Sequence, residues 1–139
     1  MMKWSVIAWV SVPLGIATWV AIADDVAPGR SSWSSDFGPV YLDVSPDGSV
    51  AGSYPKFNGT LSGNMTPSGA LYLTWLQPTS EQRCNDKKLG THYWGRVTWA
   101  PTDSDYSLKG QWSYCDSAEG SGGTWNASLQ GGSLRPKLW

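Results

Sequence analysis

From residue 30 onward, the chain consists of short runs of alternating apolar and polar residues separated by turn signals. No stretch keeps the spacing of apolar residues that an amphipathic helix requires. Asn58-Gly59 and Pro46-Asp47-Gly48 favour tight reversals, because glycine readily takes a positive φ and proline presets the turn. We therefore predict an all-β fold. The strands are expected at residues 30–35, 38–45, 49–55, 60–66, 70–77, 92–100, 106–115 and 124–130.

The alternation within these runs predicts one apolar and one polar face for each strand. In the last strand, for example, Asn126, Ser128 and Gln130 would lie on the polar face. With strands so close together in the sequence, each is expected to pair with the next. The residues predicted to face the interior include Val40, Leu42, Val44, Leu71, Leu73, Trp75, Trp125, Ala127 and Leu129.

Four strands carry a glycine between two larger residues on the apolar face: Gly52, Gly63, Gly95 and Gly110. Glycine weakens a strand, and its usual roles there are a sharp bend or space for an aromatic ring. We therefore predict a small eight-stranded antiparallel up-and-down β-barrel with one disulfide. A two-sheet sandwich is the alternative. A transmembrane barrel is disfavoured, because most of the predicted strands are shorter than the about 9 to 11 residues needed.

The N-terminus has the organisation of a signal peptide. Lys3 supplies a positive start, residues 4–23 are uncharged and mainly apolar, and Ala21-Ile22-Ala23 provides a small-x-small cleavage pattern before Asp24-Asp25. Cleavage after Ala23 predicts a secreted or periplasmic protein. An uncleaved membrane anchor is the alternative, since about 20 apolar residues can span a bilayer. The predicted organisation is a signal peptide (1–23), a barrel domain (24–132) and a C-terminal tail (133–139).

Cys84 and Cys115 are the only cysteines, and in an exported chain such a pair predicts a disulfide. The charged segment 78–91 would then be attached to one rim of the barrel, as a lid or contact loop. The alternative is that the disulfide only limits the movement of this loop. Removal of Lys3 changes the formal net charge from −1 to −2, and no basic run remains, so we expect no nucleic-acid partner.

The sequence contains little that supports catalysis. His92 is the only histidine, and the motifs of serine hydrolases, phosphate-binding loops and zinc sites are absent. Asp103 and Asp105 lie in a predicted turn, where aspartate commonly caps the backbone. We expect no enzymatic activity, no catalytic residues, no metal site and no cofactor.

Seven tryptophans remain in the cleaved chain. Indole rings can line a pocket for a flat or sugar-like ligand, and they can equally fill the interior of a narrow barrel. The sequence leaves both alternatives open. The seven residues are Trp33, Trp75, Trp94, Trp99, Trp112, Trp125 and Trp139.

A series of short motifs resembles the avidin and streptavidin family in order and approximate spacing. The motifs are WSSDFG at 33–38, DGSVAGSY at 47–54, LSG at 61–63, LTW at 73–75, YWG at 93–95, KGQW at 109–112 and WNASL at 125–129. The resemblance implies an eight-stranded barrel that binds biotin at one end. It also implies that Trp75, Trp94 and Trp112 line the pocket, that Tyr54 adds a polar contact, and that Trp125 reaches a neighbouring subunit.

The chain departs from the family at three polar positions. Ser35 replaces a pocket asparagine, Pro39 replaces a hydroxyl donor, and Gly132 falls near an expected aspartate. Each polar group of biotin that stays unpaired would cost on the order of 1 to 3 kcal/mol. The resemblance therefore supports the fold more strongly than the ligand.

We expect an exported, non-enzymatic binding protein that holds a small apolar or aromatic ligand at one end of the barrel, beside residues 78–91. The predicted ligand-binding residues are Tyr54, Trp75, Trp94 and Trp112. The alternative is a protein–protein interaction module with a filled core, such as an inhibitor or an envelope component. The expected partner is thus a small molecule or another protein, with no membrane contact beyond the signal segment, and an oligomer is compatible with the sequence.

Overall fold

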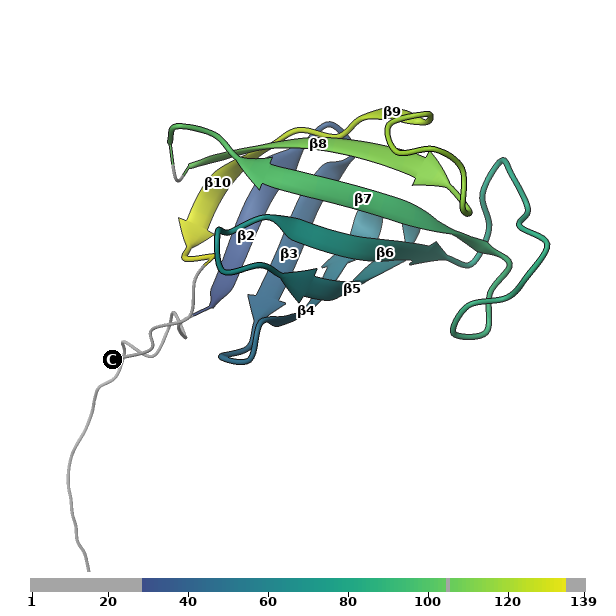
Figure 1. Cartoon of the computed structure of the whole chain (residues 1–139), viewed down its shortest axis with the longest axis horizontal. Coiled ribbons are helices and arrows are strands. Elements are labelled where there is room, and N and C mark those ends of the chain that lie inside the picture. Colours follow the sequence, from purple (N-terminus) through teal and green to yellow (C-terminus); the bar gives the residue numbers. More distant parts are fainter. Residues whose placement is uncertain (1–28, 105, 135–139) are drawn as a thin grey trace, which may run out of the picture.

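Eight antiparallel strands form in the computed structural model, which describes residues 29–104 and 106–134 (Figure 1). The last strand has two segments, β9 and β10, separated by Trp125 and Asn126. A short 3₁₀ helix, η2 (Pro55–Phe57), precedes β5. The strands are β2 (Arg30–Ser35), β3 (Gly38–Val44), β4 (Ser49–Tyr54), β5 (Gly59–Met65), β6 (Leu71–Gln77), β7 (Tyr93–Pro101), β8 (Ser107–Tyr114), β9 (Gly123–Thr124) and β10 (Ala127–Gly132).

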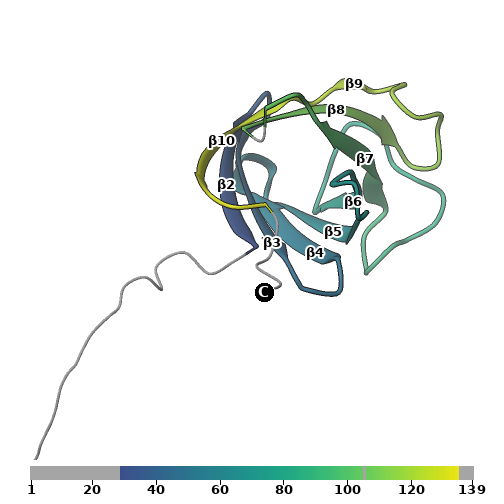
Figure 2. The same cartoon turned by 60° about the vertical axis from the view of Figure 1, so that its left-hand side comes forward.

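Each strand pairs with the next one in the sequence, as predicted. β10 pairs with β2 on one side and with β8 on the other, so the sheet closes on itself (Figure 2). The predicted eight-stranded barrel is therefore confirmed, and the two-sheet sandwich is excluded. The predicted signal peptide (1–23) and residues 135–139 of the predicted tail lie outside the described residues. Within the described part of the chain, no helix is long and apolar enough to cross a membrane.

The inward-facing side chains fill only one half of the barrel. This half lies toward the connections that join β3 to β4, β5 to β6 and β7 to β8. Figure 1 shows that β2 begins and β10 ends at the same end of the barrel. The predicted alternation is confirmed, because the expected inward residues are buried apart from Leu129, which is partly buried and packs against the core. The side chains in this half include Trp33, Val40, Val44, Val50, Leu71, Leu73, Val97, Trp99 and Leu108.

Two of the strand glycines make space for aromatic rings, as predicted. A Cβ atom on Gly95 would overlap the Trp75 ring, and one on Gly110 would overlap the Trp99 ring. At Gly52 and Gly63, the neighbours that a Cβ would meet include backbone carbonyl oxygens of the adjacent strands. The glycines on the inner face thus allow large rings and neighbouring strands to come close in a narrow barrel.

Gly95→Ala is expected to destabilise the barrel by about 1 to 3 kcal/mol, because the added methyl group meets the Trp75 ring and the Ser113 backbone oxygen. Gly131→Ala is the matched control, since its Cβ would lie 3.5 Å from Ser32 Oγ, an ordinary contact. The control should stay within about 1 kcal/mol of the original protein. Urea unfolding followed by tryptophan fluorescence measures both changes. Equal stability of the two variants would contradict the proposed role of Gly95.

Candidate ligand-binding site

A cavity of about 800 Å³ occupies the other half of the barrel. It lies at the end where the connections between β2 and β3, β4 and β5, β6 and β7, and β8 and β9 meet. The interior is therefore filled at one end and hollow at the other. Some tryptophans fill the barrel and others line a pocket, so both alternatives left open by the sequence occur. The cavity is lined by Phe37, Tyr54, Phe57, Trp75, Gln77, Thr79, Ser80, Glu81, Trp112, Tyr114, Gly122 and Trp125.

Aromatic rings in edge-to-face contact form most of the cavity wall. Trp75, Trp112 and Tyr114 make one group, with ring centroids 4.9–6.1 Å apart and interplanar angles of 73–77°. Phe37 connects this group to Trp125, which lies 5.1 Å from it. Edge-to-face pairs are a favoured arrangement of aromatic rings, so these side chains stabilise one another in place.

A chain of hydrogen bonds crosses one side of the cavity. The Tyr54 hydroxyl donates to Gln77 Oε1 over 2.9 Å, and Gln77 Nε2 donates to the Thr79 backbone oxygen over 2.9 Å. Burial raises the pKa of the Tyr54 phenol above its ordinary value. The phenol therefore stays protonated at neutral pH and acts as a hydrogen-bond donor.

The indole N–H groups in the wall differ in their partners. Trp75 Nε1 donates to the Ser113 backbone oxygen over 3.1 Å, and Trp125 Nε1 donates to Ser35 Oγ over 2.9 Å. Within residues 29–104 and 106–134, the Trp112 indole N–H and the Tyr114 hydroxyl have no hydrogen-bond partner. These two groups remain available to water or a ligand.

The Ser35 hydroxyl stabilises the wall. It accepts hydrogen bonds from Trp125 Nε1 and from the Phe37 backbone N–H, and it donates to the Gly38 backbone oxygen over 2.6 Å. These three contacts hold Trp125 and Phe37, which both line the cavity. Ser35 thus orients wall residues with its hydroxyl, at the position where the resembled family has a pocket asparagine.

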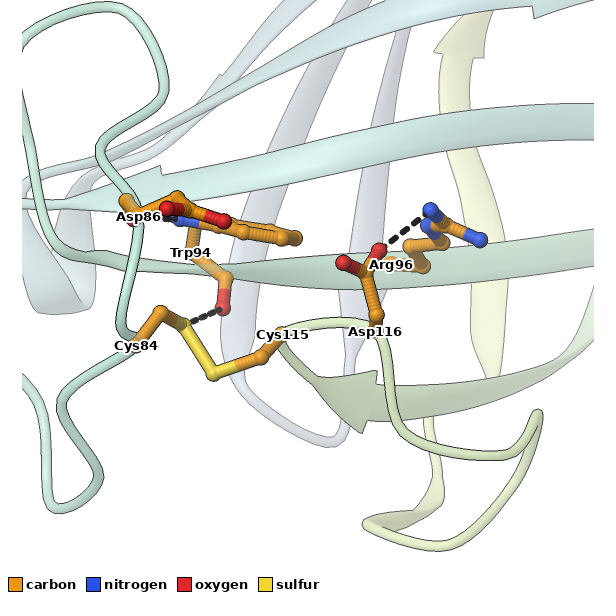
Figure 3. A network of polar contacts seen from close by, with 6 residues as sticks. All are labelled: Cys84, Asp86, Trp94, Arg96, Cys115 and Asp116. Carbon is orange, nitrogen blue, oxygen red and sulfur yellow. Dashed lines mark hydrogen bonds and ion pairs between the residues drawn. A yellow bond between two sulfur atoms is a disulfide. The ribbon is translucent and has the colours of Figure 1, made fainter.

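Of the four predicted ligand-binding residues, the cavity brings together Tyr54, Trp75 and Trp112. Trp94 does not line it. Its indole N–H donates to the Asp86 backbone oxygen over 2.7 Å (Figure 3). Its ring packs with Leu76 and Cys84 under the connection between β6 and β7, which we call the 78–92 segment. Lys88 Nζ lies 4.7 Å from the Trp94 ring centroid. Trp94 therefore attaches this segment to the outside of the barrel.

Trp125 lies inside its own barrel, whereas the family resemblance implied that it reaches a neighbouring subunit. It is buried and contacts Tyr54 and Trp99, with ring centroids 5.1 and 4.9 Å away. Its position links the filled half of the barrel to the cavity.

The predicted disulfide between Cys84 and Cys115 is confirmed, and it joins the 78–92 segment to the end of β8 (Figure 3). The Cys84 backbone N–H also donates to the His92 backbone oxygen over 2.8 Å. Nearby, Arg96 and Asp116 form an exposed ion pair at 2.5 Å, which is expected to contribute little to stability. Because Thr79, Ser80 and Glu81 line the cavity, the disulfide anchors the segment that forms one side of its mouth.

Several cavity residues were missed by the sequence interpretation. Gln77 and Tyr114 follow Trp75 and Trp112 by two positions, so strand alternation places them on the same inner face. Phe37 and Phe57 lie in connections between strands, where alternation gives no information. Glu81 belongs to the long segment 78–91, in which no local pattern distinguishes one charged residue from another.

The fold and the cavity define a small β-barrel with one hollow, aromatic-lined end. Comparisons with protein-family models, with curated proteins and with solved structures find no match for this chain. Within the described residues, no three side chains of His, Cys, Asp or Glu gather closely enough to hold a metal ion.

Proposed function

We propose that this chain is an exported, non-enzymatic binding protein that holds a small apolar or aromatic ligand in the cavity at the hollow end of the barrel. The observation that carries the proposal is the cavity of about 800 Å³ that reaches Trp75 and Trp112. This volume lies within the range of about 300 to 1,000 Å³ of typical small-molecule sites. A protein-interaction module with a filled core would not need such a space.

The character of the wall supports an apolar or aromatic ligand. Removing apolar surface from water is worth about 25 cal/mol per Å², and this cavity offers aromatic rings on most sides. The rings already contact one another, and Ser35 accepts hydrogen bonds from the Trp125 indole N–H and the Phe37 backbone N–H. Binding would therefore require little ordering of the wall, which lowers the entropic cost of association.

Export is supported by the disulfide together with the predicted signal peptide. Disulfides persist mainly in oxidising compartments such as the periplasm or the exterior of the cell. Cleavage after Ala23 would keep the whole barrel, since β2 begins at Arg30.

We further propose that the barrel is avidin-like but that its ligand differs from biotin. The closed eight-stranded antiparallel sheet is compatible with an avidin-like fold. The Ser35 hydroxyl is already hydrogen-bonded to Trp125 and to the Gly38 backbone oxygen, and Pro39 has no hydroxyl group. Gly132, near the expected aspartate, lines a hollow of about 180 Å³ with Gly69 and Pro101, at the end away from the cavity. These residues do not supply the polar contacts that the family uses.

The experiment is a titration of the exported chain (24–139) with N-phenyl-1-naphthylamine, a neutral dye that fluoresces in apolar sites. We expect one dye per barrel and at least tenfold weaker binding in Trp112→Ala, which removes an aromatic wall residue. Tyr72→Ala is the matched control, because Tyr72 is an aromatic residue of β6 that is 55% exposed and does not line the cavity. Biotin should not displace the dye.

Failure of the folded protein to bind the dye, or equal weakening by both substitutions, would refute the proposal. Circular dichroism of each variant shows that the barrel is intact. Native mass spectrometry of the protein purified from its own host would then show whether a small molecule remains bound.

A further inference from the structure

We propose that the natural ligand is an organic cation, with a tertiary or quaternary ammonium group attached to an apolar body. This inference rests on the proposed binding function and names the class of ligand. It follows from two properties of the cavity wall: the arrangement of its aromatic rings and the sign of its charge.

The rings of Trp75, Trp112 and Tyr114 are almost mutually perpendicular, with interplanar angles of 73°, 76° and 77°. Three mutually perpendicular planes share no common line. Such planes meet at a single point, so a ligand group that lies anywhere else between the three rings is out of the plane of at least one ring, on the side of its face. The face of an aromatic ring carries negative potential, which attracts a cation.

The only charge on the cavity wall, within the described residues, is also negative. Among the described residues, Glu81 is the only charged residue that lines the cavity, and no lysine, arginine or histidine does so. An anionic ligand would meet both the ring faces and this carboxylate. A cation gains from both: the ring faces act inside the cavity, where the low dielectric strengthens the interaction, and the exposed Glu81 carboxylate acts from the solvent side.

One lysine already lies over an aromatic ring of the cavity wall. Lys56 Nζ lies 5.6 Å from the ring centroid of Phe57, which is a wall residue, although Lys56 itself does not line the cavity. The free Trp112 N–H and Tyr114 hydroxyl would suit a hydroxyl or carbonyl oxygen elsewhere on the ligand. The expected ligand thus combines a positive charge, apolar surface and at least one oxygen.

Two isosteric probes test this inference. Benzyl(2-hydroxyethyl)dimethylammonium and 3,3-dimethyl-4-phenylbutan-1-ol have the same shape. The first has a positively charged nitrogen at the position where the second has a neutral carbon. Displacement of N-phenyl-1-naphthylamine from the exported chain gives both affinities. We expect the ammonium compound to bind at least tenfold more tightly, which corresponds to about 1.4 kcal/mol.

Glu81→Gln should reduce this preference about threefold, because it removes the carboxylate and keeps the shape of the side chain. Glu119→Gln is the matched control, since Glu119 lines a different surface hollow and should leave the preference unchanged. If the alcohol binds as tightly as the ammonium compound while the dye still binds, the cation proposal is wrong and the binding proposal stands. If folded protein binds neither probe nor the dye, both proposals are wrong. An unchanged preference in Glu81→Gln would refute the role of the carboxylate.

Discussion

Replacement of both Cys84 and Cys115 by serine is expected to lower the free energy of unfolding by about 3 to 4 kcal/mol, which is a large part of the stability of a small domain. The disulfide links residues separated by 31 positions. In the chain-entropy model, its loss restores the conformational freedom of this loop to the unfolded chain. Urea unfolding of the double variant measures the change, and the original protein under reducing conditions is the control. A loss below about 1 kcal/mol would contradict the prediction.

The same variant separates the two interpretations of the disulfide. Thr79, Ser80 and Glu81 line the cavity, and they lie in the segment that the disulfide fixes to β8. If the bond shapes the mouth of the cavity, the folded double variant should bind N-phenyl-1-naphthylamine more weakly than the original protein. If it only limits the movement of the loop, the affinity should stay the same. We expect the weaker binding.

The strands were largely predictable because their signals are local. Most predicted boundaries agree with the structure within one or two residues, since turns such as 45–48 are determined by their own proline and glycine residues. The last strand was predicted as one run, and the structure divides it into β9 and β10. The division follows from contacts with residues distant in the sequence. The Trp125 backbone N–H donates to the Gly110 backbone oxygen, and the Asn126 backbone N–H donates to the Asp36 carboxylate.

The position of Trp94 could also have been inferred from the sequence. The glycine pattern places Gly95 on the inner face of its strand, and neighbouring residues in a strand point to opposite faces. Trp94 must then lie on the outer face, where the structure has it beneath the 78–92 segment. The family resemblance implied that Trp94 lines the pocket, so strand alternation predicted the position of this residue better than the resemblance did.

The cavity itself was not predictable from the sequence. Alternation identifies inward residues, but it does not determine whether facing side chains meet and fill the barrel. Trp33 and Trp99 fill one half, whereas Trp75 and Trp112 surround open space in the other, and all four belong to predicted strands. The difference depends on the connections at the hollow end, which place Phe37 and Phe57 at its mouth.

Trp99→Ala is expected to destabilise the barrel by about 3 to 5 kcal/mol, because the side chain is fully buried and its removal leaves a large void. The Trp99 ring lies over Gly110, and glycine has no side chain that could fill the void left by the ring. Its indole N–H also donates to the Trp125 backbone oxygen, which would lose this partner. Trp112→Ala should cost less, since Trp112 is only partly buried and borders the cavity.

Urea unfolding of the two variants tests this difference, and an equal loss of stability would contradict it. Trp99→Phe separates packing from hydrogen bonding, because phenylalanine keeps a ring and removes the N–H donor. This variant should lose about 1 to 3 kcal/mol, the cost of an unpaired buried carbonyl oxygen plus a smaller void. Trp99 also supports Trp125, which lines the cavity. Trp99→Ala should therefore weaken dye binding although Trp99 does not line the cavity, and this effect would show that the filled half of the barrel keeps the hollow half in shape.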